Sequence, residues 1–234
     1  IKSGNEVVCF DNLITSSKEN ISHLEDVVEF RFIDGDLRDI DVLDEAMKGC
    51  THICHQAALG SVPRSIDDPI KSTEINLIGG LNLLCVAKSH GIKRFVFASS
   101  SSVYGDDPEL PKCEHRVGNP LSPYAASKAS FESYARVFYE IHRMETIGMR
   151  YFNVFGPRQS PEGAYAAVIP KFIDSLMKGK SPKIYGDGEQ TRDFTYVKNV
   201  VEANLLALFE ENEMAFGQCF NVACGDTISV NQLF

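Results

Sequence analysis

The chain has 234 residues, of which 44% are hydrophobic and 24% are charged, and its formal net charge is −9. This length and composition allow a sizeable core, formed by one α/β domain or by one domain with a smaller attached region. The acidic balance argues against nucleic acid as the main partner, although local arginines and helix N-termini can still bind an anionic ligand. No apolar run reaches the length of a membrane span and the first residues do not form a signal peptide, so we expect no membrane partner.

The seven cysteines form no CxxC pair, and most of them lie in apolar segments. An odd number of cysteines without a disulfide framework indicates reduced, packed thiols in a cytoplasmic protein. The six histidines are scattered, and neither they nor the cysteines have the spacing of metal ligands. We therefore expect no metal site.

Short apolar runs alternate with helical patterns along most of the chain. This alternation predicts an α/β fold with a doubly wound parallel sheet, right-handed crossovers and helices on both faces. The predicted strands are 6–10, 29–33, 52–55, 94–98 and 146–150, and the predicted helices are 41–48, 70–90 and 123–143.

After Tyr151 the pattern loosens, and the sequence predicts a small C-terminal region with less regular elements. We therefore divide the chain into a domain over 1–155 and a region over 156–234 that is interleaved with it and cut short at its C-terminus. The predicted elements of this region are helices at 165–178 and 197–211, strands at 183–185, 194–196 and 221–223, and a helix that opens at 230–234.

The chain begins on what we interpret as the end of a helix, residues 1–5, followed by the second strand of the fold. In doubly wound folds the first strand lies in mid-sheet and leads into the glycine-rich turn that holds a pyrophosphate. No GxGxxG or GxxGxxG motif occurs in this sequence. Either the first strand and its glycine-rich loop belong to a longer protein, or the chain cannot bind a dinucleotide in the usual way. Because a sheet without its central strand has two unpaired edges, we favour the first alternative.

An apolar run that ends at Ala98 leads into four serines, and a helical pattern with Tyr124 and Lys128 begins shortly afterwards. A spacing of four residues places these two side chains on one face of a helix. A lysine ammonium beside a phenol favours the phenolate, so we expect the pKa of Tyr124 to fall towards neutrality. A nearby serine hydroxyl can hold the substrate oxygen whose proton the tyrosine takes. These groups predict proton transfer while a cofactor carries a hydride; the alternative is an exposed contact between helical neighbours.

Two further strand ends carry acidic residues suited to a dinucleotide. Asp11, followed by Asn12, closes a predicted strand where a carboxylate accepts hydrogen bonds from ribose hydroxyls and repels a 2′-phosphate, which favours NAD over NADP. Asp36 and Leu37 follow the next strand, where they can contact the adenine edge. The alternatives are a strand-end turn at Asp11 and a helix cap at Asp36.

A third strand end carries His55, followed by Gln56, Ala57 and Ala58. The small residues leave room for the backbone of the cofactor. We interpret His55 as a packed strand-end histidine in preference to a catalytic one.

A larger set of motifs spreads over nearly the whole chain. It comprises Ala57-Ala58-Leu59-Gly60-Ser61-Val62-Pro63-Arg64-Ser65 with Asp68-Pro69, Asn119-Pro120-Leu121-Ser122-Pro123-Tyr124, Arg150-Tyr151-Phe152-Asn153-Val154-Phe155-Gly156, Gly163-Ala164-Tyr165-Ala166-Ala167-Val168-Ile169-Pro170, and Gly186-Asp187-Gly188 with Arg192-Asp193-Phe194. With this set the chain resembles the extended short-chain dehydrogenase/reductase superfamily, and within it the nucleotide-sugar 4-epimerases, above all bacterial UDP-N-acetylglucosamine 4-epimerases and their uronate-accepting relatives. The resemblance implies a Rossmann fold, NAD as the cofactor and a UDP-sugar as the substrate.

The resemblance also implies a role for each candidate side chain. Tyr124 is the expected base, Lys128 binds the nicotinamide ribose and lowers the pKa of Tyr124, and Ser100 bonds the 4-hydroxyl of the sugar. Tyr124 and Lys128 thus count among the cofactor contacts, and the other implied cofactor contacts are Asp11, Asn12, Asp36, Leu37, Gln56, Ala57, Ala58, Asn76 and Tyr151. The implied substrate contacts are Ser61, Arg64, Ser65, Ser100, Ser101, Asn153, Ala167, Val168, Ile169, Tyr185 and Arg192.

On the substrate side, the resemblance places Arg192 on the diphosphate, where a guanidinium can bond two oxygens at once. Asn153 is expected to bind a phosphate or sugar oxygen, and the segment from Ala167 to Ile169 is expected to pass the uracil. The segment from Ser61 to Ser65, with Arg64, is expected to border the hexose. The alternatives are a weak surface ion pair between Arg192 and Asp193 and a plain turn around Pro63.

The residues after Ser100 separate neighbouring reactions. Related 4,6-dehydratases carry acidic residues there, and related sugar-acid decarboxylases keep a glutamate at the position of Ser102. Because Ser101 and Ser102 are poor proton carriers at neutral pH, we expect oxidation and re-reduction at C4 without elimination. We therefore expect an NAD-dependent 4-epimerase, an isomerase, for a UDP-N-acetylhexosamine or its uronate. The alternatives are a UDP-glucose or UDP-glucuronate 4-epimerase and, more remotely, a non-catalytic NAD-binding sensor.

The resemblance finally implies a homodimer that packs through the helices at 70–90 and 123–143. The apolar side chains of these helices are equally suited to burial against the sheet. They are Ile75, Leu81, Leu84, Phe131, Tyr134 and Phe138.

Overall fold

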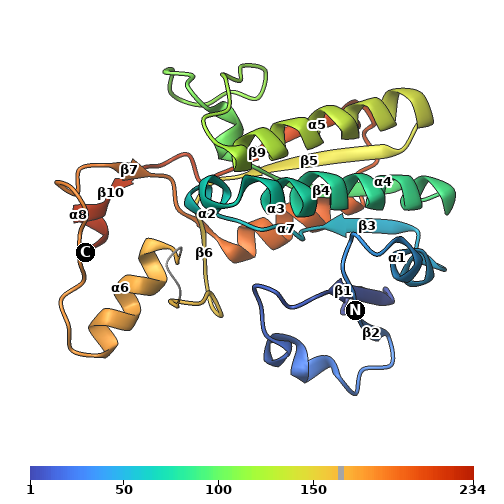
Figure 1. The fold of residues 1–234 in the computed structure, drawn as a ribbon, viewed down its shortest axis with the longest axis horizontal. Coiled ribbons are helices and arrows are strands. Elements are labelled where there is room, and N and C mark those ends of the chain that lie inside the picture. Colours follow the sequence, from blue (N-terminus) through green and yellow to red (C-terminus); the bar gives the residue numbers. More distant parts are fainter. Residues whose placement is uncertain (163–165) are drawn as a thin grey trace.

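The computed structural model describes residues 1–162 and 166–234, in which strands alternate with helices (Figure 1). Its strands are β1 (Val7–Asp11), β2 (Phe30–Asp34), β3 (His52–His55), β4 (Arg94–Ser100), β5 (Glu145–Tyr151), β6 (Val154–Phe155), β7 (Thr191–Arg192), β8 (Thr195–Tyr196), β9 (Gln218–Val222) and β10 (Ile228–Ser229). Its α-helices are α1 (Ile40–Met47), α2 (Val62–Asp67), α3 (Pro69–Thr73), α4 (Gly79–Ser89), α5 (Pro123–His142), α6 (Val168–Met177), α7 (Val197–Leu208) and α8 (Val230–Leu233). Short turns of 3₁₀ helix are η1 (Lys18–Leu24), η3 (Ser101–Tyr104) and η4 (Glu213–Ala215), and a π-helical turn is η2 (Glu74–Ile78).

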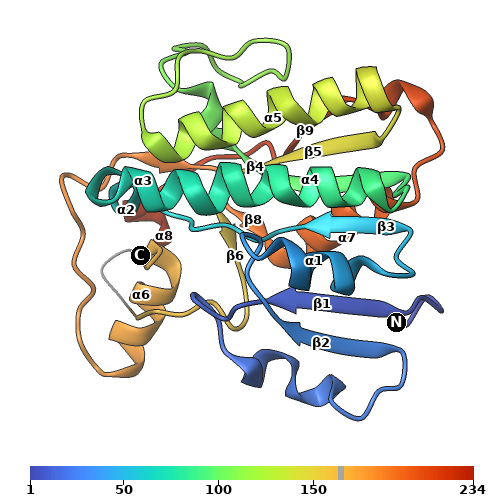
Figure 2. The same ribbon diagram turned by 45° about the vertical axis from the view of Figure 1, so that its right-hand side comes forward.

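The main sheet has the strand order β3-β4-β5-β9, and all its neighbouring strands are parallel. Helices α4 and α5 cover one face and α7 covers the other (Figures 1 and 2). Because both faces are covered, the central strand β4 is buried along nearly its whole length. This arrangement confirms the doubly wound parallel α/β fold.

The first two strands form a separate parallel pair, in which Val7 lies opposite Phe30 and Asp11 opposite Asp34. This pair is not hydrogen-bonded to β3, and Figure 2 shows α1 between the two. Two small sheets complete the described strands: β6 pairs with β8 in parallel, and β7 pairs with β10 in antiparallel orientation.

The core lies on both faces of the main sheet. One cluster lies between the sheet and the two helices α4 and α5. In it the rings of Phe95, Phe97 and Phe131 pack against one another at tilted or edge-on angles, and Leu84 belongs to the same cluster. On the other face, α7 packs on a second cluster around Val96. Of the six apolar residues that we expected either at a dimer interface or against the sheet, five lie in or against the first cluster or are buried beside it, and Tyr134 is exposed.

Local signals explain where α5 begins and ends. Ser122 caps the helix by accepting a hydrogen bond from the backbone N–H of Ala125, and Pro123 occupies the first helical position. The helix ends where Arg143 adopts a left-handed conformation, with φ of 56°. The result places Tyr124 in the first turn of a long helix that runs across the sheet.

The structure differs from the sequence prediction in several elements. The helix predicted at 70–90 is divided into α3, η2 and α4, because a π-helical turn interrupts it. The strand predicted at 183–185 is wrong, since these residues have no neighbouring strand and line a cavity instead. The first residue of the helix predicted at 165–178 lies outside the described residues, and α6 begins at Val168. The short strands β6, β7 and β10 and the helix α2 were not predicted.

The C-terminal part of the chain contributes to two places. Strand β9 joins the main sheet beside β5, and α7 covers that sheet. Helix α6, the β7–β10 pair and α8 lie together to one side of the sheet (Figure 1). The residues after 155 therefore contribute both to the main sheet and to a group of elements beside it.

Candidate active site

The end of the central strand β4 meets the first turn of α5. Strand β4 is two residues longer than predicted, so Ser100 is its last residue. There the Ser100 hydroxyl forms a hydrogen bond with the Tyr124 phenol. The backbone N–H of Tyr124 donates to the Ser65 hydroxyl at 3.0 Å, which ties the start of α5 to α2. The structure therefore brings Ser100 and Tyr124 together.

Lys128 follows Tyr124 by one helical turn. Its ammonium donates a hydrogen bond to the carbonyl oxygen of Ala98 at 2.8 Å. The side chain is buried, so the alternative of an exposed helical pair is wrong. Burial lowers the pKa of Lys128 to about 8, against the opposing effect of the Glu132 carboxylate. The group is therefore charged at neutral pH and loses its charge in mildly alkaline solution.

The pKa of Tyr124 does not follow our expectation. Burial raises it above the ordinary value of a tyrosine, and the hydrogen bond with Ser100 offsets part of the rise. The predicted fall towards neutrality is therefore wrong for this structure. The physical reason is that burial disfavours the charged phenolate by more than the hydrogen bond with Ser100 favours it.

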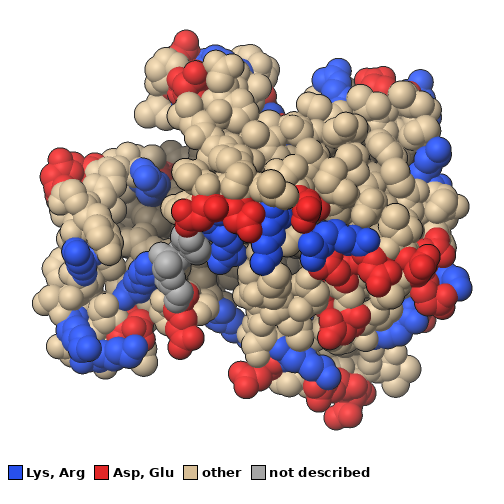
Figure 3. All heavy atoms as spheres, viewed as in Figure 1, with Lys and Arg blue, Asp and Glu red and all other residues tan. Residues whose placement is uncertain are grey.

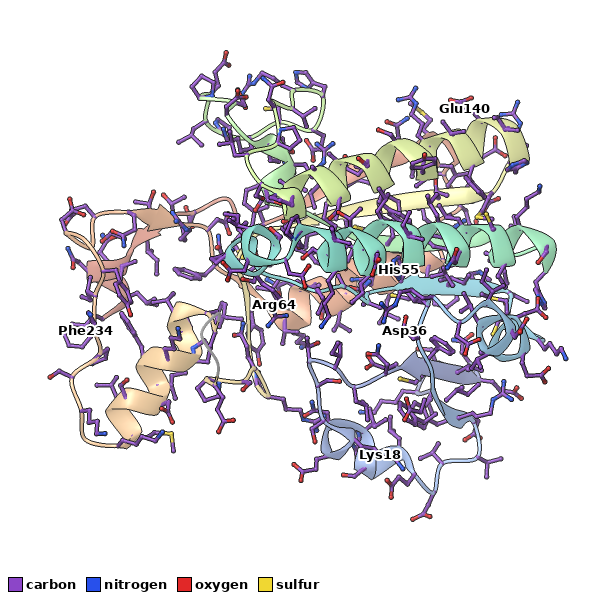
Figure 4. All side chains as sticks on the ribbon, in the orientation of Figure 1. Lys18, Asp36, His55, Arg64, Glu140 and Phe234 are labelled. Carbon is purple, nitrogen blue, oxygen red and sulfur yellow. The ribbon has the colours of Figure 1, made fainter. Side chains whose placement is uncertain are left out.

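His55 ends β3 beneath the helix layer (Figure 4). Its ring packs edge-on against Phe131 and Phe95, at centroid distances of 5.4 and 6.0 Å. Burial, helped by the charge of Lys128, lowers the pKa of His55 to about 3, so the imidazole is neutral. This environment agrees with a packed histidine, as we expected.

The ends of β1 and β2 are joined by their polar side chains. The Asn12 amide donates to Asp36 Oδ2 at 2.8 Å. Asp11 Oδ1 accepts hydrogen bonds from the Leu13 backbone N–H at 2.6 Å and from the Ser16 hydroxyl at 3.4 Å, which is the strand-end turn that we kept as the alternative. Within the described residues the second Asp11 oxygen accepts no such bond, so the turn and a ligand contact are compatible.

Asp36 is held by the guanidinium of Arg38, with Nε–Oδ1 and Nη2–Oδ2 distances of 2.9 and 2.8 Å. These hydrogen bonds hold the pKa of Asp36 well below its usual range. The cap of α1 is Asp39, so the alternative of a helix cap at Asp36 is wrong. Leu37 is 9% exposed and belongs to the core, which limits what its side chain can contact.

Gln56, Tyr151 and Asn204 form a closed ring of hydrogen bonds. Tyr151 donates to Gln56 at 2.9 Å, the Gln56 amide donates to Asn204 at 3.0 Å, and the Asn204 amide donates to Tyr151 at 2.7 Å. The ring ties α7 to the ends of β3 and β5. We did not predict Asn204; the available signal was a polar residue on the apolar side of a helix.

The two alanines after Gln56 have small side chains. Ala57 packs against the core and Ala58 is partly buried, so both occupy little space at the end of β3.

Asn76 lies in the π-helical turn and is 2% exposed. Its amide oxygen accepts from the Leu59 N–H at 2.7 Å and its amide nitrogen donates to the Leu59 carbonyl at 3.1 Å. Ser61, two residues after Leu59, has φ of 103°, a strained conformation for a residue other than glycine. Asn76 therefore holds the loop that enters α2, and its amide is engaged by protein atoms.

A cavity of about 340 Å³ lies between β6 and α6. Several predicted substrate residues line it: Asn153, Ala167, Val168, Ile169, Tyr185 and Arg192. The polar lining that we did not predict is Gln159, Lys183 and Gln190. The structure thus gathers predicted substrate residues that are distributed along the sequence from Asn153 to Arg192.

Arg192 is exposed at this cavity, and its guanidinium donates to the Thr191 carbonyl at 2.7 Å. Asp193 points elsewhere: its carboxylate is buried and accepts from the backbone N–H groups of Cys224 and Gly225 at 3.1 and 2.8 Å. The alternative of an Arg192–Asp193 surface ion pair is therefore wrong.

The remaining predicted sugar contacts lie outside this cavity. Ser61 caps α2 and Arg64 lies within it, so the alternative of a plain turn around Pro63 is wrong. Ser101 begins the short helix η3 directly after Ser100. Figure 4 shows Arg64 at the end of the helix layer that faces the part of the chain with α6 and Phe234.

The seven cysteines are free, but none is fully buried and Cys54, Cys85 and Cys224 are exposed. The expectation of packed thiols is therefore wrong in part, because several apolar runs place their cysteine on a solvent-facing side. Within the described residues, no group of three or more His, Cys, Asp or Glu could hold a metal ion. No described helix is both long and apolar enough to cross a membrane.

Comparisons with known proteins agree with this geometry. Residues 1–223 match the model of the NAD dependent epimerase/dehydratase family. A putative UDP-glucose 4-epimerase of Methanocaldococcus jannaschii is 41% identical over the whole chain and 74% of its own length.

Two solved structures are also similar to the chain. The UDP-N-acetylglucosamine 4-epimerase of Methanobrevibacter ruminantium, in complex with UDP-N-acetylmuramic acid, is 42% identical with a TM-score of 0.92, over 98% of this chain and 72% of that one. The UDP-glucose 4-epimerase of Thermus thermophilus, in complex with NAD, is 37% identical with a TM-score of 0.87, over 99% and 74%. The chain therefore belongs to the NAD dependent epimerase/dehydratase family, and its cofactor is NAD.

Proposed function

We propose that the protein inverts C4 of a UDP-N-acetylhexosamine, or of its uronate, through a transient 4-keto sugar. The observation that carries the proposal is the meeting of Ser100, Tyr124 and Lys128 at the end of β4. A phenol bonded to a serine hydroxyl, with a buried ammonium one turn away, is suited to removing a proton from a sugar hydroxyl.

Each of the three side chains has a separate task. Ser100 binds the 4-hydroxyl oxygen, Tyr124 takes its proton during oxidation and returns it during reduction, and Lys128 places a buried positive charge one helical turn from the phenol. When bound at the strand ends, NAD would supply reversible hydride transfer at C4, so the net reaction would consume no oxidant. The cofactor contacts that we propose are those at the strand ends: Asp11, Asn12, Asp36, Leu37, Gln56, Ala57, Ala58, Asn76 and Tyr151. Asn76 acts there by holding the Leu59 loop.

The cavity beside α6 is our proposed site for the nucleotide. A neutral lining of Ala167 and Val168 suits a planar base, and the exposed guanidinium of Arg192 suits a diphosphate. Anchoring at this cavity leaves the sugar, bordered by Ser61, Arg64 and Ser101, free to turn between the two hydride transfers. The division into a cofactor-binding domain, 1–155, and a region that binds the UDP-sugar, 156–234, is part of this proposal.

The neutral side chains after Ser100 support epimerisation over dehydration. Elimination of water needs an acid and a base besides the tyrosine, whereas Ser101 and Ser102 do not ionise near neutral pH. The Ser102 hydroxyl is buried without a hydrogen-bond partner among the described residues, so it is poorly placed to exchange protons with solvent.

We also propose that the protein is a homodimer. Charged side chains surround a largely uncharged surface over α4 and α5 (Figure 3). Exposed apolar residues on α3, η2 and α5 are Ile70, Ile78, Tyr134, Val137 and Ile141. Burial of this surface against a second copy would remove it from water.

Free thiols suit the reducing cytoplasm, where we place the protein.

Proton NMR of the intact protein with single UDP-sugars tests the proposed reaction. The substrates are UDP-N-acetylglucosamine, its uronate, UDP-glucose and UDP-glucuronate, each without added NAD. A new galacto-configured signal from the N-acetylated sugars is the expected result. Turnover of only the sugars without the acetamido group would assign the enzyme to UDP-glucose or UDP-glucuronate instead, and no turnover of any of them would contradict the proposal.

A further inference from the structure

Helix α5 presents three polar side chains to the end of β4 at intervals of four residues. They are Tyr124, Lys128 and Glu132. The phenol bonds Ser100, the ammonium bonds the carbonyl of Ala98, and the carboxylate accepts a hydrogen bond from the Ser99 hydroxyl. Three successive turns of the helix are therefore bonded to three consecutive residues of the strand.

Glu132 is held from its other side by Arg150, which is paired with Ser99 in the register of β4 and β5. The guanidinium donates to both carboxylate oxygens, with Nε–Oε1 and Nη2–Oε2 distances of 2.9 and 2.8 Å. The Arg150 side chain is only 7% exposed and the Glu132 side chain only 12%. A bidentate pair in this environment has a fixed geometry, because either ion alone would be buried without compensation.

Arg150 is in turn fixed by the structure around it. Its Nη1 donates to the Tyr104 hydroxyl at 3.1 Å and to the Glu114 carbonyl at 2.9 Å. The Tyr104 hydroxyl donates to the amide oxygen of Asn221, on β9, at 2.6 Å. Glu132 therefore connects the proposed catalytic residues to a network that spans β5, β9 and the loop before α5.

We propose that Glu132 is a positioning residue, which through Ser99 and Arg150 fixes Tyr124 and Lys128 against the end of β4 and places its negative charge one helical turn from Lys128. The inference rests on the proposed function, because it assigns Tyr124 and Lys128 the roles described above. Among the described residues, Glu132 itself forms no hydrogen bond with the Tyr124 phenol or the Lys128 ammonium, and its carboxylate accepts from Ser99 and Arg150.

The charges around Lys128 support this role. His55 faces it from β3 and is neutral, Tyr124 precedes it by one turn, and Glu132 follows it by one turn. Burial lowers the pKa of Lys128, and Glu132 is the group that opposes this fall. Cys219, from β9, also faces Glu132, and burial together with that carboxylate raises the pKa of its thiol. Removal of the Glu132 charge should therefore release the proton of Lys128 at lower pH.

The test is a titration of Lys128 in protein that carries ¹³Cε-labelled lysine, with the Lys128 signal assigned by its absence in Lys128→Met. In Glu132→Gln we expect the midpoint to fall below that of the parent protein, and in Glu132→Asp, which keeps the charge, we expect it to return towards the parent. The matched control is Glu140→Gln: Glu140 lies at the far end of the same helix (Figure 4), its side chain is 54% exposed and it is 3.9 Å from Arg136. This control should leave the midpoint in place.

The same variants should differ in catalysis. Glu132→Gln should lower kcat by about 10–100-fold and move the alkaline limb of its pH profile to lower pH, since misplacement of reacting groups is costly. If Glu132→Gln does not fold because Arg150 is left unpaired, the double variant Glu132→Gln/Arg150→Met decides, and its Lys128 midpoint should also fall. An unchanged midpoint in a folded variant that lacks the Glu132 charge overturns the inference. The titration uses no substrate, so a parent protein without epimerase activity would contradict the proposed function and leave this test intact.

Discussion

The Lys128 ammonium is 2.8 Å from the carbonyl oxygen of Ala98, on the strand whose last residue is Ser100. This contact joins the buried lysine to the strand end. The pKa of Tyr124 is nevertheless raised, because burial disfavours the charged phenolate. Burial of the Lys128 charge lowers the free energy of unfolding.

Lys128→Met should stabilise the protein at neutral pH. The folded pKa of about 8 is below the ordinary value of an unfolded lysine, so between these values the unfolded chain binds more protons and the free energy of unfolding rises with pH. Below about pH 8 the buried charge costs up to about 3 kcal/mol. Urea unfolding at several pH values should show that the stability gain of Lys128→Met shrinks as the pH rises from 8 to 10. A gain that is independent of pH would contradict the assignment of a buried, titrating lysine.

Tyr124→Phe should abolish most of the epimerase activity without unfolding the protein. The phenol is the only group that we assign to proton transfer, and a general base contributes about 10²–10⁴-fold to a rate. Tyr134→Phe is the matched control, because Tyr134 is 44% exposed on the same helix. Turnover assayed by NMR should fall only in the first variant. More than a tenth of the parent activity in folded Tyr124→Phe would rule out this base.

Arg192→Met should weaken substrate binding more than it slows the chemical step. The guanidinium lies exposed at the cavity, where it donates to a backbone carbonyl, and a charged hydrogen bond to a phosphate contributes about 1.5–3 kcal/mol. We expect KM for the UDP-sugar to rise about 10–100-fold with a smaller change in kcat. Arg136→Met, on the exposed side of α5, serves as the control. Equal KM values for the two variants would remove Arg192 from the binding site.

His55 should make the protein sensitive to acid. Its folded pKa of about 3 is below the ordinary value of a histidine, so between about pH 6.5 and 3 only the unfolded chain binds the proton, and stability falls as the pH falls through this range. His55→Phe keeps an aromatic ring beside Phe95 and Phe131 and should flatten this part of the stability profile. His115→Gln, at an exposed position, should leave the slope as it is. An unchanged slope in His55→Phe would show that the ring is not buried in solution.

Much of the fold follows from local sequence signals. Buried runs such as 94–98 predicted the strands of the main sheet, and the Ser122–Pro123 pair marks the start of α5. Local sequence signals did not predict the elements that are stabilised by distant partners. Strands β6 and β7 have two residues each and exist only through β8 and β10, so no local period identifies them. The π-helical turn that holds Asn76 depends on its bonds to Leu59, 17 residues earlier.

The candidate site shows the same division. The spacing of Tyr124 and Lys128, with the serines before them, was enough to predict their proximity. The direction of the pKa shift of Tyr124 could not be predicted, because it depends on how deeply the phenol is buried in the folded chain. Asn204 and Glu132 also escaped prediction, since each acquires its partners from strands remote in the chain.

The most direct test of the proposed reaction uses UDP-N-acetylglucosamine that carries deuterium at C4. The intact protein is incubated with it in ordinary water, and the galacto-configured product is examined by NMR and mass spectrometry. If the hydride leaves C4 and returns to the other face of the same sugar while Tyr124 handles only the hydroxyl proton, the product keeps its deuterium at C4. A product that has exchanged this deuterium for solvent hydrogen would contradict the account, as would the absence of any inverted product.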